Sequence, residues 1–470
     1  MRARALGVFV AVCLGCVWGA PGAAQVLVPQ WNTQPGELGP LLGGAQAALA
    51  SGGEALWSNP AGLAHERERR LTVSGDALRW RTAAAEGPAA ETVALAPASL
   101  AYVQALGRRP GYPRFALGVS LALRTDQRWP TPVESTRPGT SASLPPGVPS
   151  VEGVVQTSFG DSVSVTATGD ATGALTVLAP GVGLGLAVAD WVRFGLALEL
   201  QRVSLRAQVL RTAVYGATAS DGAHTLDGQS QLAWSLAGEA WRLAPALGAQ
   251  FDLTSGVQLG IAWQLPTATV AGSGRLHYQR SDTFAWDVGG GPQSATAAVL
   301  VSRAGLPFRL EAPQRLQVGL ALRSDRFLIE FDVYHSAALA PYDVLPESQS
   351  GPPSTIALAL PAQRTSTRSV LGTALGMAYA RSARTSLLLG LAVDPAPVPP
   401  DDPVFRSVTL ITVSGGVYHV RGGLSYSLGV RYRDARQAAA SVVPPDGGEP
   451  VPTALALREV AAHTAVSLGF

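Results

Sequence analysis

The chain has 470 residues, a formal net charge of +2 and 14% charged residues, a charge content that is low for a soluble protein of this length. Lysine is absent and the arginines are scattered, so the sequence indicates no nucleic-acid partner. The two cysteines, Cys13 and Cys16, both precede residue 25, which leaves no thiolate metal site and no disulfide after that point.

Residues 1–24 have the pattern of a secretory signal peptide. Arg2 and Arg4 precede a short apolar stretch over residues 5–18, and Gly22-Ala23-Ala24 offers the small residues that a signal peptidase reads. We therefore expect the mature chain to begin at Gln25. A buried N-terminal helix and a lipid-anchored N-terminus are the alternatives that the pattern leaves open.

Residues 25–69 are not strand-like. Small residues over 43–50 lead through Gly52–Trp57 to Ser58-Asn59-Pro60-Ala61, where the Asn-Pro step ends a weakly helical stretch. A segment of about 45 residues is too short for an independent domain, but it could fill the lumen of a wide barrel. We expect a plug there.

From residue 70 to the C-terminus, apolar residues recur at every second position over the length that a tilted membrane strand needs, about 9–11 residues. In 315–323, for example, leucine or valine occupies every even position and Arg, Gln, Gly or Ala the intervening ones. The clearest segments of this kind are 115–123, 257–264, 315–323, 327–334 and 424–433.

Three features favour a membrane barrel over a soluble sandwich. Charged residues lie almost entirely at the positions between the apolar ones. This is expected because a lipid-facing arginine destabilises a membrane barrel by about 2–4 kcal/mol. The opposite face is often Gly or Ala, which suits a lumen partly filled by another segment. Short turns at 254–256, 323–326 and 381–384 alternate with long connections at 127–150, 343–368 and 394–402.

The positions of the apolar residues change along the segment that begins near Val192. They have even numbers through Leu200 and odd numbers from Val203. A strand that keeps one face to lipid cannot change parity without an extra residue, so the pattern predicts a bulge or a tight turn at Gln201-Arg202.

The C-terminus ends on an alternating strand in which Thr464, Val466, Leu468 and Phe470 share one face. A terminal Phe in this position resembles the signal by which bacterial outer-membrane barrels are recognised for insertion. We therefore expect the barrel-assembly machinery to be a partner during insertion, with Phe470 as the insertion signal.

The plug motif Asn59-Pro60-Ala61 just ahead of the first strand resembles the N-terminal hatch of the FadL-type outer-membrane transporters of long-chain fatty acids. Weaker similarities follow at 96–100 and 312–319. The resemblance implies an all-β fold: a transmembrane antiparallel β-barrel of about fourteen strands over 70–470 in a Gram-negative outer membrane, with a small hatch over 25–69 in its lumen. It also implies that hydrophobic ligands enter from outside and leave through a lateral path into the membrane.

The leading hypothesis is therefore a passive transporter of hydrophobic molecules, a monomer without cofactor, whose partners are hydrophobic small molecules and outer-membrane lipid. No substrate-binding residue can be assigned. Six histidines show no metal-ligand spacing, and Gly160-Asp161-Ser162 lacks the strand-turn-helix context of an esterase nucleophile, so no metal or catalytic site is predicted. The alternative is a PorV-like barrel that anchors or shuttles secreted proteins; a diffusion porin and an enzyme are less favoured.

Overall fold

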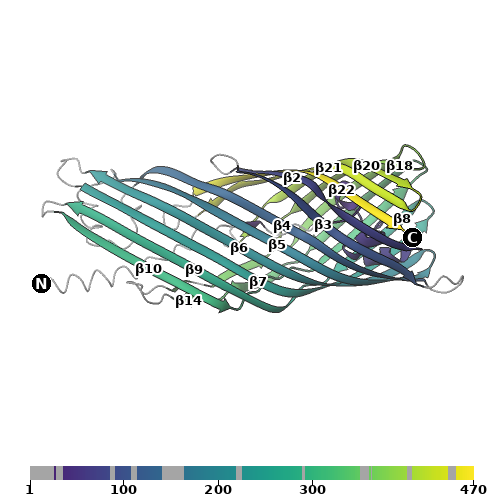
Figure 1. Cartoon of the computed structure of the whole chain (residues 1–470), viewed down its shortest axis with the longest axis horizontal. Coiled ribbons are helices and arrows are strands. Elements are labelled where there is room, and N and C mark those ends of the chain that lie inside the picture. The colour runs from purple at the N-terminus through teal and green to yellow at the C-terminus, as the bar shows by residue number, and fades with distance from the viewer. Residues whose placement is uncertain are drawn as a thin grey trace.

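The computed structural model is a closed antiparallel β-barrel, and it describes residues 26–27, 35–84, 90–106, 114–139, 163–218, 225–287, 292–349, 359–360, 362–399, 405–442 and 451–470. Its sheet contains sixteen strands that close the barrel through fourteen wall positions. The ribbon forms a long tube whose C-terminal end carries the short turns (Figure 1). The predicted fold class is confirmed. The predicted signal peptide over 1–24 lies outside the described residues.

The wall strands follow one another around the barrel in chain order. Their bounds are β2 (Arg69–Ala84), β3 (Ala90–Leu106), β4 (Arg114–Gly139), β5 (Val163–Ala189), β6 (Val192–Thr218), β7 (Thr225–Thr254), β8 (Val257–Gln264), β9 (Ala268–Asp287), β10 (Gln293–Leu306), β11 (Arg315–Arg323), β12 (Phe327–Ser336), β17 (Val370–Ala380), β18 (Thr385–Pro395), β20 (Thr409–Arg421), β21 (Leu424–Val442) and β22 (Val451–Gly469).

Short elements complete the described chain. They are β1 (Val26–Leu27), paired with β19 (Phe405–Arg406); β13 (Leu339–Leu345), paired with β16 (Gln363–Thr367); β14 (Ser348–Gln349), paired with β15 (Ala359–Leu360); and three 3₁₀ turns, η1 (Gly39–Leu41), η2 (Gly52–Leu56) and η3 (Pro60–His65). None of the described helices is long and apolar enough to cross a membrane.

Two wall positions are each shared by two strands. β8 pairs with residues 246–254 of β7, near the short-turn end, and β9 pairs with residues 225–243 of the same strand. Residues 265–267 connect β8 to β9. β11 and β10 form the next position, and residues 307–314 between them turn into the barrel, where Phe308 and Leu310 are buried. Proline at 307 and 313, which cannot donate to a ladder, explains why the strand is interrupted there.

The alternation read from the sequence is the lumen-versus-lipid alternation of the wall. In β11, Leu316, Val318, Leu320 and Leu322 are exposed on the outside, whereas Arg315 and the other odd residues point inward and, through Ala321, are buried. The same holds for β4, β8, β12 and β21, and for Val466, Leu468 and Phe470 at the C-terminus. The outer face is therefore a continuous apolar band, as a lipid-facing surface requires.

The predicted bulge or turn at Gln201-Arg202 is wrong. β6 runs unbroken through both residues, and its register against β7 does not shift. Odd residues point inward along the whole strand; what changes is which face is apolar. From Val192 to Leu200 the large apolar side chains mostly face outward, whereas from Val203 onward most of them face inward, with Leu210 and Val214 as outward exceptions.

This inversion is the pattern expected where a barrel wall passes from lipid into water. Arg202 forms an exposed ion pair with Glu239 of β7 at 2.7 Å, beside the exposed Trp241. Charge and an amphipathic indole are what a membrane–water boundary favours. In a wall surrounded by water the hydrophobic effect turns the apolar residues inward, as most of them are from Val203 onward.

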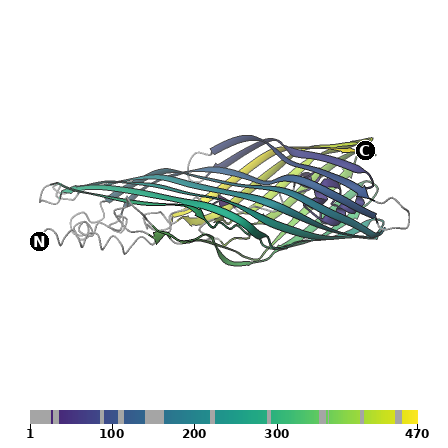
Figure 2. The ribbon, with the colours of Figure 1, turned by 60° about the horizontal axis from the view of Figure 1, so that its bottom comes forward.

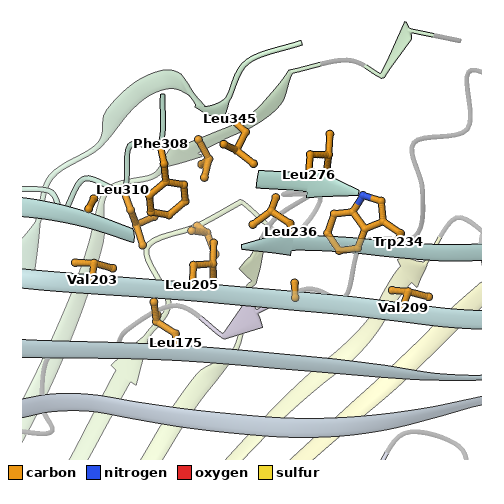
Figure 3. Close-up of a cluster of buried hydrophobic side chains, with 14 of the residues drawn as sticks. Leu175, Val203, Leu205, Val209, Trp234, Leu236, Leu276, Phe308, Leu310 and Leu345 are labelled. Atoms are coloured by element: carbon orange, nitrogen blue, oxygen red, sulfur yellow. The ribbon is translucent and has the colours of Figure 1, made fainter. Parts of the chain in front are cut away.

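The part of the wall above the boundary, here called the extension, encloses an apolar core. β5, β6, β7, β9 and β10 reach far beyond the ends of β2 and β3 (Figure 1). Their inward side chains pack on the segment 307–314, as the labelled residues in Figure 3 show. The core includes Leu175, Val203, Leu205, Trp234, Leu236, Leu276, Phe308, Leu310 and Leu345.

The lengths of the connections were only partly predicted. The short turns at 254–256, 323–326 and 381–384 are confirmed. The expected loop over 127–150 is wrong for its first part, because β4 continues to Gly139, paired with β5 throughout. The predicted long connection at 343–368 also contains short strands over its described residues, whereas among those of 394–402 only the last two residues of β18 are in a strand. Strands that leave the membrane keep their hydrogen bonds but need no lipid-facing alternation, so the sequence pattern ends before the strand does.

Candidate functional site: a segment seated in the lumen

Residues 35–66, here called the hatch, lie inside the barrel at the short-turn end (Figures 1 and 2). Nearly all of them are buried. Asn59 begins η3: its side-chain oxygen accepts the Ala61 N–H at 3.2 Å, and Pro60 occupies the first position of the turn, where its missing N–H is no loss.

Glycines in the wall form the seat of the hatch. On most of them a Cβ would collide with hatch atoms: on Gly195 with Pro60, on Gly248 with Asn59, and on Gly260 with Ala47. Many are cross-strand neighbours, such as Gly195 with Gly248 and Gly260 with Gly319. The members of this glycine belt are Gly118, Gly183, Gly185, Gly195, Gly248, Gly260, Gly319, Gly376, Gly390, Gly416 and Gly429.

The belt explains the small inward residues noted in the sequence. Without side chains at these positions, the backbone of the hatch lies directly against the backbone of the wall. The predicted reason for small inward residues, that another segment fills the lumen, is thereby confirmed for this end of the barrel.

Two carboxylates on β12 hold the middle of the hatch. Asp332 Oδ2 accepts the N–H groups of Gln46 at 2.8 Å and Ala47 at 2.9 Å, and Glu330 Oε1 accepts the N–H of Ala48 at 2.6 Å. Both carboxylates are fully buried. Three consecutive N–H groups with no helix or sheet partner thus find carboxyl oxygens as acceptors.

Asn59 and Gln250 hold the carbonyl side of the same segment. The Asn59 amide nitrogen donates to the carbonyl oxygens of Ala47 at 2.6 Å and Ala249 at 3.0 Å. Gln250 of β7 donates to Ala48 O at 3.0 Å and Ala50 O at 3.2 Å. The bonds of Asn59 join the two halves of the hatch to each other and to the wall.

The start of the hatch is fixed by two glutamates. Glu54 Oε2 accepts the N–H groups of Glu37 at 2.9 Å and Leu38 at 3.0 Å, and burial raises the pKa of its carboxyl group. Glu37 accepts hydrogen bonds from Ser425 and Ser467 of the wall. His463 of β22 donates to Gly36 O at 3.1 Å.

Apolar contacts hold the hatch on two sides. Leu56, Trp57 and Leu63 pack with Val103 and other inward residues of β3 and β4. Leu41 and Leu42 pack on Leu388 of β18. Burial of side chains of this size contributes about 1.5–3 kcal/mol each. The hatch is therefore held by packing on two sides and by hydrogen bonds around its central segment.

A cavity of about 660 Å³ opens below the hatch at the short-turn mouth, lined by polar residues that include His65, Arg193 and Asp252. Burial and the nearby Arg193 lower the pKa of His65 to about 4, so its imidazole is neutral at pH 7. Its Nε2 lies 3.0 Å from Gln250 Oε1.

Above the hatch the lumen narrows. The space between Trp57, Gln201 and the wall break at Leu265 and Pro313 is about 20 Å³, which is room for about one water molecule. A ligand can pass this level only if the hatch or the core moves.

The structure brings the predicted motif residues Asn59, Pro60 and Ala61 together against β6 and β7. Phe470 is exposed on the lipid side, and its backbone pairs with Arg69 at the start of β2, where the barrel closes. Its role as an insertion signal stays a prediction, as do the boundaries of the hatch at 25–69. Among the described residues, no group of three His, Cys, Asp or Glu side chains could hold a metal ion.

Sequence reasoning missed Glu330, Asp332, Glu54 and Gln250. A signal was present for the first two, since two acidic residues occur on the inward parity in the middle of a membrane strand. In a water-filled lumen such residues need no explanation, so only their contacts identify them as hatch ligands.

Solved structures share this architecture. They include a FadL homologue from Pseudomonas aeruginosa (TM-score 0.59, 12% identity, 95% of this chain and 100% of that chain). The toluene transporter TodX of Pseudomonas putida (0.53, 16%, 95% and 99%) and the monoaromatic hydrocarbon channel CymD (0.53, 15%, 93% and 98%) also match. The chain has the FadL-type fold. The resemblance inferred from Asn59-Pro60-Ala61 is thereby confirmed for the fold. No protein-family model and no curated protein matches the chain, so the FadL-type assignment rests on structure.

Proposed function

We propose that this protein transports hydrophobic small molecules across the outer membrane, with the hatch as its gate. The observation that carries the proposal is the apolar interior of the extension. Directly above the membrane boundary the lumen is lined by Leu, Val, Trp and Phe, whereas a porin for polar solutes needs a wet, polar lumen. The related folds named for toluene, monoaromatic hydrocarbons and FadL support the same class of ligand.

The hatch is suited to a gating role by the way it is held. Its central segment is fixed to the wall by hydrogen bonds, each of which contributes about 0.5–1.5 kcal/mol net, or about 1.5–3 kcal/mol where the acceptor is charged. Such bonds can exchange for water when the segment moves. A segment held on every side by covalent bonds or apolar packing would need more free energy to open.

For the exit we propose a lateral path between β3 and β4. Their ladder ends at Ser99 opposite Ala122, yet β4 continues to Gly139 with β5 as its partner. Among the described residues, no strand-to-strand hydrogen bonds join β3 and β4 beyond this point, which lies next to the register level of Arg202 at the edge of the apolar band. A photoreactive fatty acid captured during transport should label residues 90–98 or 123–139, and labelling confined to the short-turn mouth would contradict this exit.

The gate is tested with a reversible cross-link. A Cβ on Gly376 of β17 would lie 3.2 Å from the Cβ of Ala45 in the hatch and 3.0 Å from that of Leu42. After a small shift of the hatch, the first distance would reach the roughly 3.5–4.5 Å typical of disulfides. Cells that lack their own transporter and express Ala45→Cys/Gly376→Cys would be assayed for uptake of labelled oleate and labelled toluene. We expect saturable uptake of at least one probe under reducing conditions, its loss on oxidation and its return on reduction.

The controls are the two single cysteine variants, which should be insensitive to oxidation. If the cross-link forms but uptake continues, the hatch is not the gate. If the inserted, heat-modifiable wild type takes up neither probe, transport of these ligand classes is contradicted.

The anchor for secreted proteins stays the second candidate because the space beside Trp57 is only about 20 Å³, and an anchor requires a sealed lumen. It predicts that the oxidised cross-link leaves secretion intact and that no hydrophobic probe enters.

A further inference from the structure

The turns at the short-turn end carry an arc of exposed arginines. Arg326 lies in the turn between β11 and β12, Arg381 and Arg384 in the turn between β17 and β18, and Arg421 at the end of β20, just before the turn to β21. These four residues are here called the arginine arc. The turns are neighbours: Ala380 N–H donates to Arg326 O at 2.8 Å, and Val420 N–H donates to Arg384 O at 2.9 Å.

The charge of the arc is not neutralised. Asp325 is the only acidic residue in these three turns. Within the part of the chain that the structure describes, no side chain of the arc forms an ion pair. At the other membrane boundary, by contrast, Arg202 is paired with Glu239.

The arc lies at the depth of lipid headgroups. Outward-facing apolar residues follow within one to three positions: Phe327 beside Arg326, Leu387 after Arg384 and Leu424 after Arg421. Phe327 and Tyr379 stack with ring centroids 5.0 Å apart next to Arg326 and Arg381. Aromatic rings at the end of an apolar band mark the interface between hydrocarbon and water.

We propose that the arginine arc binds the phosphates of anionic phospholipids in the leaflet around the short-turn end. A guanidinium group matches a phosphate through two parallel hydrogen bonds and is always charged. None of the four arginines lines the cavity at the mouth, although Val420 and Gly422 on either side of Arg421 do. The other three arginines adjoin outward-facing apolar residues, which favours lipid over an acidic protein approaching the mouth. The inference rests on the membrane placement in the proposed function but not on transport.

The test compares lipid selectivity of the full chain in bilayers of phosphatidylethanolamine that contain a small share of spin-labelled phosphatidylglycerol. The fraction of label immobilised at the protein gives the preference for the anionic lipid. Each arginine near an anionic surface contributes about fivefold. We therefore expect the wild type to prefer phosphatidylglycerol and Arg326→Gln/Arg381→Gln/Arg384→Gln/Arg421→Gln to lose that preference by roughly tenfold or more.

A matched control removes exposed arginines of the extension, Arg206→Gln/Arg275→Gln/Arg303→Gln, and should keep the wild-type preference. Heat-modifiability confirms insertion of each variant, and Arg381→Gln/Arg384→Gln serves as the milder variant if the fourfold change does not fold. No preference in the wild type would overturn the proposal and assign the arc to an acidic protein, and an unchanged preference in the arc variants would overturn it equally. Oleate and toluene uptake is measured separately, so failure of transport does not count against lipid binding.

Discussion

The side-chain amide of Asn59 donates a hydrogen bond to the carbonyl oxygen of Ala249 at 3.0 Å, across 190 positions of the chain. Because the same amide also donates to Ala47 O, one buried side chain ties both halves of the hatch to the barrel wall. The hatch can therefore loosen locally without unfolding the barrel, since the strand ladders do not depend on this bond.

Asn59→Ala should free the hatch. It removes two donated bonds and the cap of η3, and each buried group left unsatisfied costs about 1–3 kcal/mol. We expect amide hydrogen exchange over residues 46–62 to accelerate roughly ten- to a thousandfold while exchange in the strands is unchanged. Ser58→Ala is the control, because Ser58 Oγ bonds only to Glu54 O within the hatch. Equal exchange in both variants would contradict the anchoring role of Asn59.

The glycine belt predicts which glycines tolerate a methyl group. Gly195→Ala and Gly260→Ala place a Cβ inside the space of Pro60 and Ala47, so both should displace the hatch and expose it to protease in an inserted barrel. Gly415→Ala is the matched control, because its Cβ would meet nothing closer than 3.4 Å. Protection of the hatch in all three variants would refute tight seating.

The inversion of the apolar face in β6 predicts opposite outcomes for one substitution at two outward positions. Leu198→Arg faces lipid and should destabilise the barrel by about 2–4 kcal/mol, whereas Leu210→Arg lies beyond the membrane boundary and should change stability by less than about 0.5 kcal/mol. Urea titration of the barrels in lipid vesicles measures both. Similar losses at the two positions would show that the membrane boundary is not at Arg202.

His65 makes closure of the hatch depend on pH. Its pKa is about 4 in the closed state because of burial, whereas in water a histidine titrates near 6.5. Opening is therefore favoured by protonation: closure should be most stable above pH 6.5 and lose roughly 3 kcal/mol as the pH falls to 4. Arg193 disfavours the charged imidazole further, while Asp252 acts in the opposite direction.

The measurement is hatch hydrogen exchange between pH 4 and 7 in the wild type and in His65→Gln. Glu54 contributes with the opposite sign, because burial raises its pKa, so the informative quantity is the difference between the two proteins. We expect it to change by about a hundredfold over this range. The exposed His335 supplies the control His335→Gln, and a difference that is constant with pH would refute the role of His65.

Much of the wall could be predicted because every second side chain of a membrane strand faces lipid and is apolar. The alternation over 316–322 and 424–432 identifies the lipid-facing residues without knowledge of the neighbouring strands. The prediction from this alternation failed at Gln201-Arg202. There the apolar residues move to the other face of the strand, but the strand itself continues without a bulge or turn. A local pattern reports which face is apolar, but it does not say whether lipid or a protein core makes that face favourable.

The sequence by itself determined the barrel, its lipid-facing residues, the small inward residues and a non-strand segment ahead of residue 70, since each follows from spacing and side-chain size. Only the tertiary structure decided that Asp332 binds Gln46 and Ala47, that Gly195 and Gly248 meet in register beneath Asn59, and that the extension closes over an apolar core. The physical reason is sequence distance. Those contacts join residues up to about 286 positions apart, and their register is set by the closure of the whole sheet, to which no local pattern refers.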